Sequence, residues 1–85
     1  MKTFTYKIKD DAGMHARPAG LLVKRAEKFE SEIEVSLNGK TADAKRLFSL
    51  MSLGAAKGDE ISVKISGGDE DAAEAELSSF FSENL

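Results

Sequence analysis

The stretch IEVSLNGKTADA, residues 33–44, decides how this chain folds. Its apolar residues alternate with polar ones up to Leu37, which is the period-two pattern of a strand with one buried face. The strand runs into Asn38-Gly39, the strongest short signal for a β-hairpin, and a second short strand is predicted around residues 41–44. The chain therefore contains an antiparallel strand pair.

The same alternation predicts one strand before this hairpin and one after it. The inward-facing residues of these two strands are predicted to be Phe4, Tyr6 and Ile8 in the first and Ile61, Val63 and Ile65 in the second. The opposite face of the sheet is predicted to be solvated. Its residues are Thr3, Thr5, Lys7, Glu34, Ser36, Ser62 and Lys64.

Three helices are predicted from apolar spacing and from their end signals. The first carries its buried stripe at helical intervals, with Pro18 in the first turn, where a missing N–H costs nothing. Its stripe is Ala19, Leu22, Val23, Ala26 and Phe29. RLFSLMSLG, residues 46–54, predicts a short helix that stops at Gly54. The acidic run DEDAAEAE, residues 69–76, opens the last helix, whose buried stripe is Ala73, Leu77, Phe80 and Phe81.

The predicted order is strand, helix, strand, strand, short helix, strand, helix. A hairpin in the middle and helices long enough for crossovers indicate an α+β open-faced sandwich, with a four-stranded antiparallel sheet and three helices on one face. With 85 residues, the chain is long enough for one small domain, residues 1–85, and leaves little room for an enclosed substrate pocket.

Composition excludes several classes of site. The chain has no cysteine and one histidine, so neither a disulfide framework nor the usual zinc set is expected. No apolar run approaches a membrane span, and we expect a cytoplasmic, soluble protein without membrane insertion. The net charge is +4 over residues 1–57 and −7 over residues 58–85. This split favours docking to acidic protein surfaces over binding to nucleic acid.

The stretch GMHARPAG, residues 13–20, carries the chemistry. His15 is predicted at the start of the first long helix, where unpaired backbone N–H groups and the helix dipole favour an anion. Arg17 adds a planar donor fork that suits phosphate oxygens. Both features disfavour the imidazolium and keep a ring lone pair available near pH 7, so His15 is a candidate nucleophile toward a phosphoryl donor.

Two other functions fit the same residues. A small acyl phosphatase could use Arg17 as an anion cradle and water as the final acceptor. An interaction or regulatory module could bind partners without covalent change. A histidine before a helix is also commonly a cap or a surface residue.

The segment Gly13, His15, Ala16, Arg17, Pro18, Ala19 resembles the phosphorylation-site signature of the HPr family, the phosphocarriers of the bacterial phosphoenolpyruvate-dependent sugar phosphotransferase system. The resemblance extends over nearly the whole chain, through NGK (residues 38–40), MSLG (residues 51–54) and AKGDEI (residues 56–61). It implies that Enzyme I phosphorylates Nδ1 of His15, with the phosphate held by Arg17 and by the backbone of Ala16 and Arg17. The group then passes to an EIIA domain of a sugar permease.

The resemblance implies no metal or organic cofactor, and it implies a partner-docking surface around the histidine. On this chain that surface would use Gly20, Lys24, Leu47, Phe48 and Met51, with Lys45 and Arg46 at its edge. We expect at least two of the three apolar residues to be exposed. A transient carrier is expected to be a monomer, because its reactive face must stay free.

One position departs from the family pattern. Many members from Gram-positive bacteria carry a regulatory serine after the lysine that matches Lys45, and this chain has Arg46 there. Ser49 and Ser52 do not occupy that position, so the resemblance does not extend to this regulation. A fixed positive charge is expected to favour docking to acidic partners at all times.

Overall fold

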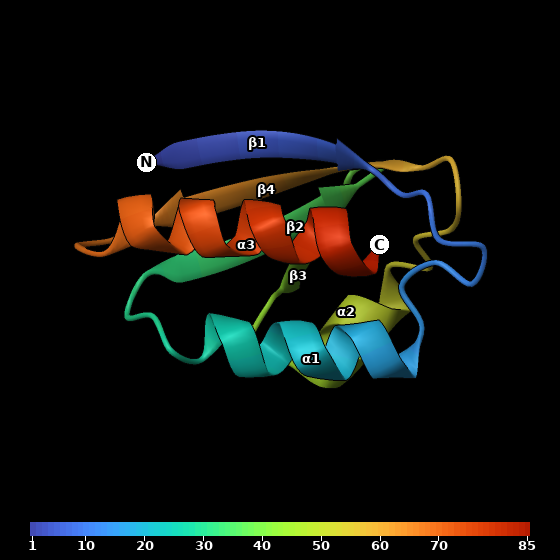
Figure 1. Cartoon of the computed structure of the whole chain (residues 1–85), viewed down its shortest axis with the longest axis horizontal. Coiled ribbons are helices and arrows are strands. Elements are labelled where there is room, and N and C mark those ends of the chain that lie inside the picture. Colours follow the sequence, from blue (N-terminus) through green and yellow to red (C-terminus); the bar gives the residue numbers. More distant parts are fainter.

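The computed structural model describes all residues from Met1 to Leu85. Four strands and three helices follow one another in the predicted order (Figure 1). The elements are β1 (Lys2–Lys7), α1 (Ala16–Ala26), β2 (Glu32–Leu37), β3 (Lys40–Asp43), α2 (Leu47–Ser52), β4 (Glu60–Ser66) and α3 (Glu70–Asn84). The predicted α+β class and its element order are therefore confirmed.

The four strands form one antiparallel sheet in the order β1-β4-β2-β3. The two central residues of the β2–β3 hairpin, Asn38 and Gly39, have φ angles of 51° and 83°. This left-handed backbone matches the twist of the flanking strands, and asparagine and glycine adopt it at the lowest steric cost. The strand β3 covers Lys40–Asp43, one residue earlier than predicted at each end. The hairpin thus forms where the sequence indicates it.

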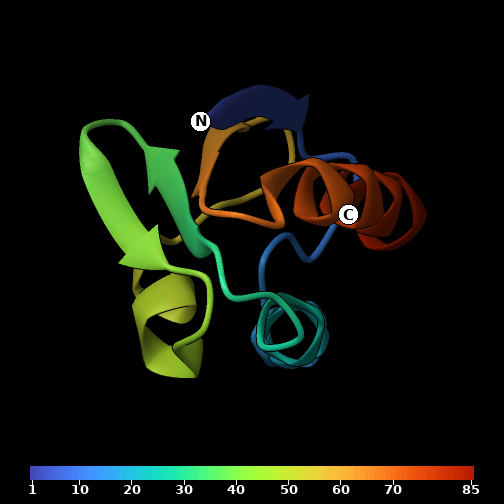
Figure 2. The same cartoon turned by 90° about the vertical axis from the view of Figure 1, so that its left-hand side faces the viewer.

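All three helices cover one face of the sheet, and the other face is bare (Figure 2). The core lies between the sheet and the helices, and its fully buried members include Val35, Ile61, Val63 and Leu22. The side chains predicted to point outward are exposed or half-buried, as the alternation requires. No helix combines the length and the apolar character needed to cross a lipid bilayer.

Aromatic side chains connect β1 to α3. The Phe81 ring is buried and lies 5.9 Å from the Phe4 ring and 5.7 Å from the Tyr6 ring, between ring centroids. The Phe80 ring meets Phe81 edge-on at 5.8 Å. Such pairs add a specific geometry to the burial of apolar area. They fix α3 along the edge strand, as its predicted buried stripe requires.

Phe29 differs from its predicted place on a helix. The helix α1 ends at Ala26, and Phe29 follows it in a turn, half-buried against the core. The backbone N–H of Phe29 still donates to the carbonyl oxygen of Ala26, at 3.1 Å, so the chain leaves the helix through a tightened last turn. The apolar spacing therefore identified a core residue correctly and its secondary structure incorrectly.

The end of the molecule opposite the start of α1 is held by Asp69, which precedes α3 (Figure 1). Its carboxylate accepts hydrogen bonds from the backbone N–H of Glu30 at 2.8 Å and of Ser31 at 3.0 Å, and from the Ser31 hydroxyl. The Ser31 hydroxyl, followed by the Glu30 N–H, lowers the pKa of Asp69 below the ordinary value of 3.8. This contact fastens the turn after α1 to the start of α3.

Candidate functional site

The loop between β1 and α1 is held against the loop before β4. Gly13 has a φ of +66°, and a Cβ at this position would lie 2.5 Å from the carbonyl oxygen of Ala55. The backbone N–H of Met14 donates to that same oxygen at 2.9 Å, and the Met14 side chain is buried. Glycine is required here both for the backbone angle and for the close approach. The contact fixes the chain immediately before His15.

The same loop is tied to the end of α3. The backbone N–H groups of Lys9 and Asp10 donate to a main-chain oxygen of Leu85, at 2.6 Å and 2.7 Å. The Asp10 carboxylate in turn accepts the N–H of Ala12 at 3.0 Å, which is the local turn that aspartate favours. The last turn of α3 therefore lies beside the residues that lead into His15.

His15 is the residue that begins α1. Its backbone is extended, with φ −88° and ψ −176°, and its carbonyl oxygen accepts the first helical bond from Ala19 at 3.0 Å. The N–H groups of Ala16 and Arg17 precede that bond and have no helical acceptor, while Pro18 has no N–H. The imidazole caps none of them and is 46% exposed. An exposed nitrogen nucleophile therefore stands beside two free backbone donors.

Arg17 and His15 line one open hollow. Its other lining residues are Asp10, Pro18, Leu21, Glu83 and Asn84. The first turn of α1 carries no acidic side chain, so the helix dipole and the Arg17 guanidinium act together on an anion placed there. The start of α1 and Arg17 favour a phosphoryl group on the ring of His15, while the Asp10 and Glu83 carboxylates lie elsewhere along the lining of the same hollow.

Most of the predicted docking residues lie on α1 and α2, which pack against each other (Figure 1). Phe48 is 81% exposed, Met51 is exposed and Leu47 is half-buried, so two of the three apolar side chains are on the surface. On α1, Lys24 is exposed, and no atom lies within 4 Å of the place a Cβ would take at Gly20. These residues and Arg46 are the accessible members of the predicted docking set.

Lys45 does not join this group. Its ammonium donates to the carbonyl oxygen of Phe29 at 2.8 Å, so it closes the turn after α1. Arg46 precedes α2, and its guanidinium is 3.8 Å from the Asp43 carboxylate while most of the side chain is exposed. Arg46 is therefore the more accessible of the two cations, although it pairs with Asp43.

Several residues of the hollow are absent from the sequence-based set. Only Leu21 could have been found from the sequence. It is a large apolar residue outside the buried stripe of α1, which indicates an exposed apolar position. Asp10 has no functional role in the sequence-based predictions. Glu83 and Asn84 reach the hollow because the end of α3 packs beside the loop, which no local pattern reveals.

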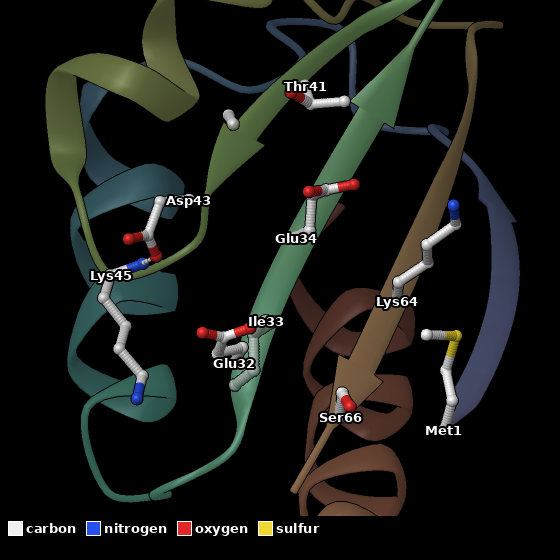
Figure 3. Close-up of a pocket in the computed structure, with 10 residues that line it drawn as sticks. Met1, Glu32, Ile33, Glu34, Thr41, Asp43, Lys45, Lys64 and Ser66 are labelled. Carbon is white, nitrogen blue, oxygen red and sulfur yellow. Dashed lines mark hydrogen bonds between the residues drawn. The ribbon is translucent and has the colours of Figure 1, made fainter.

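A larger hollow lies on the bare face of the sheet, with a volume of about 560 Å³ against about 240 Å³ beside His15 (Figure 3). Figure 3 shows Lys45 and Lys64 on opposite sides of it, with the carboxylates of Glu32 and Glu34 between them. Charges of both signs alternate there, and neither His15 nor Arg17 takes part. No three histidine or acidic side chains are grouped as a metal ion would require.

Comparisons with known proteins identify the family and the fold. Residues 2–83 match the family model described as the phosphotransferase system HPr component phosphorylation site. The phosphocarrier protein HPr of Buchnera aphidicola is 47% identical over 74 residues, which cover 87% of each chain. A histidine-containing phosphocarrier protein of Mycoplasma superposes with a TM-score of 0.93 at 33% identity, over 96% of this chain and 93% of that one. An HPr of Thermoanaerobacter tengcongensis covers all of both chains, with a TM-score of 0.88 and 40% identity.

Proposed function

This chain belongs to the HPr family of phosphocarriers of the phosphotransferase system, and from that membership we propose that His15 is the residue on which it carries the phosphoryl group. The resemblance seen in the sequence is thereby confirmed. A phosphocarrier is phosphorylated transiently and is not itself a catalyst. The observation that supports His15 is its position at the start of α1, exposed beside the free N–H groups of Ala16 and Arg17.

Arg17 and the backbone are proposed to stabilise the phosphorylated state. Nδ1 of His15 attacks the phosphorus atom, and the negative charge of the bound group is met by the N–H groups of Ala16 and Arg17 and by the Arg17 guanidinium. The two backbone donors belong to the first turn of α1, which supports the proposal because they need no folding step to become available. Because the phosphorus–nitrogen bond stays reactive, the group can be passed on.

The proposed donor is Enzyme I, and the proposed acceptors are EIIA domains of sugar permeases. Both are proposed to dock on one surface made by Gly20, Lys24, Arg46, Leu47, Phe48 and Met51. Its exposed apolar side chains and its cations fit a partner with an apolar centre and an acidic rim. Lys45 is proposed to support this surface indirectly, by closing the turn after α1.

Residues 1–85 are proposed to act as one unit and as a monomer in the cytoplasm, where Enzyme I would meet it. A single reactive face serves both donor and acceptor, so any assembly that covered α1 and α2 would block transfer. Light scattering combined with size-exclusion chromatography tests this state. A stable dimer whose interface includes Phe48 would contradict it.

The decisive experiment is phosphorylation by Enzyme I with labelled phosphoenolpyruvate. The wild-type chain should acquire label that is lost in acid and kept in base, as expected for a phosphorus–nitrogen bond. His15→Ala should acquire none, while its circular dichroism matches that of the wild type. Absence of label from the wild type would defeat the proposal.

The two alternatives predict other results. An acyl phosphatase would release inorganic phosphate from a small acyl phosphate without Enzyme I. A binding module would retain its partner affinity in His15→Ala and would never carry label. No observation favours the acyl phosphatase or the binding module over the phosphocarrier.

A further inference from the structure

Asp10 is the acidic residue whose carboxylate approaches the imidazole of His15. Its Oδ2 lies 4.0 Å from Nε2 of the ring, and both side chains line the same hollow. The distance is at the limit of ion-pair range and longer than a hydrogen bond, and both side chains are partly exposed. Hydrogen bonds of reacting groups are commonly long before the partner binds.

The position of Asp10 is fixed by its own backbone and carboxylate. Its N–H donates to Leu85 at 2.7 Å, its carbonyl oxygen accepts the N–H of Gly13 at 3.1 Å, and Oδ2 accepts the N–H of Ala12 at 3.0 Å. Two backbone contacts therefore fix the main chain of Asp10, and one hydrogen bond orients its carboxylate. A carboxylate held this rigidly loses little conformational entropy when it binds the imidazole.

The other charges around the ring act differently. Arg17 and Glu83 also line the hollow, and the Glu83 carboxylate makes no ion pair with the imidazole. Asp11, the next residue along the chain, pairs with Lys57 at 2.8 Å. Asp10 is thus the acidic group that can act on Nε2 of His15.

We propose that Asp10 is a positioning residue for phosphoryl transfer, which holds the ring proton of His15 on Nε2 and leaves the lone pair on Nδ1. This inference rests on the proposed function of His15 and adds a determinant of which ring nitrogen reacts. In neutral imidazole one nitrogen carries the proton and the other the lone pair, and the hydrogen bond to the first decides which is which.

Phosphoryl transfer to His15 requires no movement of the ring proton. The bond from Nδ1 to phosphorus forms, and the bond from phosphorus to the donor atom breaks. The ring becomes positively charged, because the proton stays on Nε2, and the Asp10 carboxylate offsets that charge. When the group leaves for the acceptor, the phosphorus–nitrogen bond breaks and the neutral ring returns with the same proton on Nε2.

The experiment compares Asp10→Asn with Asp11→Asn. Asparagine at position 10 can still accept the N–H of Ala12, so the turn is kept and the charge is lost. Asp11→Asn removes the same charge one residue away, where it faces Lys57. Because His15 is the only histidine, ¹⁵N labelling of histidine gives one imidazole spectrum, from which the ratio of the two neutral tautomers is read.

The ratio of Nε2–H to Nδ1–H tautomers should fall by about two- to fivefold in Asp10→Asn, the factor expected when a partly exposed hydrogen bond to the ring N–H is weakened. Asp11→Asn should keep the wild-type ratio, and both variants should unfold at the wild-type urea concentration. An unchanged ratio in Asp10→Asn, or an equal change in Asp11→Asn, would overturn the role of Asp10.

A second readout uses phosphoramidate as a chemical donor and locates phosphorus by its coupling to ring nitrogen. The wild type should be labelled on Nδ1, and the share on Nε2 should rise in Asp10→Asn. An equal share in both would count against Asp10. Failure of Enzyme I to label the wild type would count against the proposed function, while the tautomer ratio, which needs no donor, would still decide on Asp10.

Discussion

Replacing Gly13 by alanine perturbs the loop that positions His15 without touching the site itself. Gly13 and Gly54 both have a φ of +66°, so alanine at either position meets the same backbone penalty. They differ in surroundings, because a Cβ at Gly13 would lie 2.5 Å from the Ala55 oxygen and a Cβ at Gly54 has nothing within 4 Å. Gly54→Ala is therefore a matched control.

The two costs can be estimated separately. A left-handed alanine costs about 1–2 kcal/mol, which is the whole expected loss of unfolding free energy for Gly54→Ala. The close approach at Gly13 obliges the backbone to shift, which adds about 1–3 kcal/mol by comparison with overpacked cores. Gly13→Ala should therefore lose about 2–5 kcal/mol in total. Urea unfolding followed by circular dichroism measures both values.

The functional consequence follows from the position of the loop. A displaced Gly13 moves the start of α1, so phosphorylation of Gly13→Ala by Enzyme I should slow by about tenfold or more under folding conditions. Gly54→Ala should be phosphorylated at the wild-type rate. If Gly13→Ala proved as stable as Gly54→Ala, the close approach would not be a constraint. If it lost stability and kept its rate, the loop would not be what positions His15.

Four further predictions concern the site, the docking surface and the opposite end of the molecule. Arg17→Lys keeps the charge and loses the planar donor fork, so phosphorylation by Enzyme I should slow by about tenfold in rapid-quench assays; an unchanged rate would show that charge alone suffices. Phe48→Ala should raise the KM for Enzyme I by about tenfold and leave the unfolding free energy unchanged, because the ring is 81% exposed. Arg46→Ser should slow phosphorylation by Enzyme I more at low salt than at high salt, because salt screens the charge. A variant phosphorylated at the wild-type rate at both salt concentrations would contradict the proposed docking role of Arg46. The lowered pKa of Asp69 means that its carboxylate stabilises the fold above the ordinary carboxyl range and that this stabilisation is lost as the pH falls through the lowered pKa. As the pH falls below about 4, the unfolding free energy of Asp69→Asn should therefore decrease less than that of the wild type. Urea unfolding measures both values at each pH, and an equal decrease in the two proteins would contradict the contact with Ser31.

Features that depend on a few neighbouring residues were predictable from the sequence. The positive φ angles of Asn38 and Gly39 follow from the chemistry of those two residues between alternating strands. Pro18 in the first turn of α1 marks the start of a helix, and Gly54 after α2 marks the end of one, because of their own backbone properties. The exposed position of His15 at the start of α1 follows from these local signals.

Features that depend on tertiary packing were not predictable in this way. Lys45 could be assigned to the docking edge by its place in the chain, and only the fold shows that its ammonium bonds to Phe29. Asn84 and Asp10 meet at the hollow because the last turn of α3 lies beside the loop before α1. Residues 74 positions apart share no periodic pattern, so only the structure shows that they line the same hollow.

The bare face of the sheet offers an attachment point for measuring binding at the docking surface. Thr5 lies on that face, exposed, opposite Ser62 in the register of β1 and β4. Because the chain contains no cysteine, Thr5→Cys would give a unique thiol for attachment to a sensor chip or a fluorophore. Every tethered molecule would then be anchored in one orientation, with α1 and α2 directed into solution.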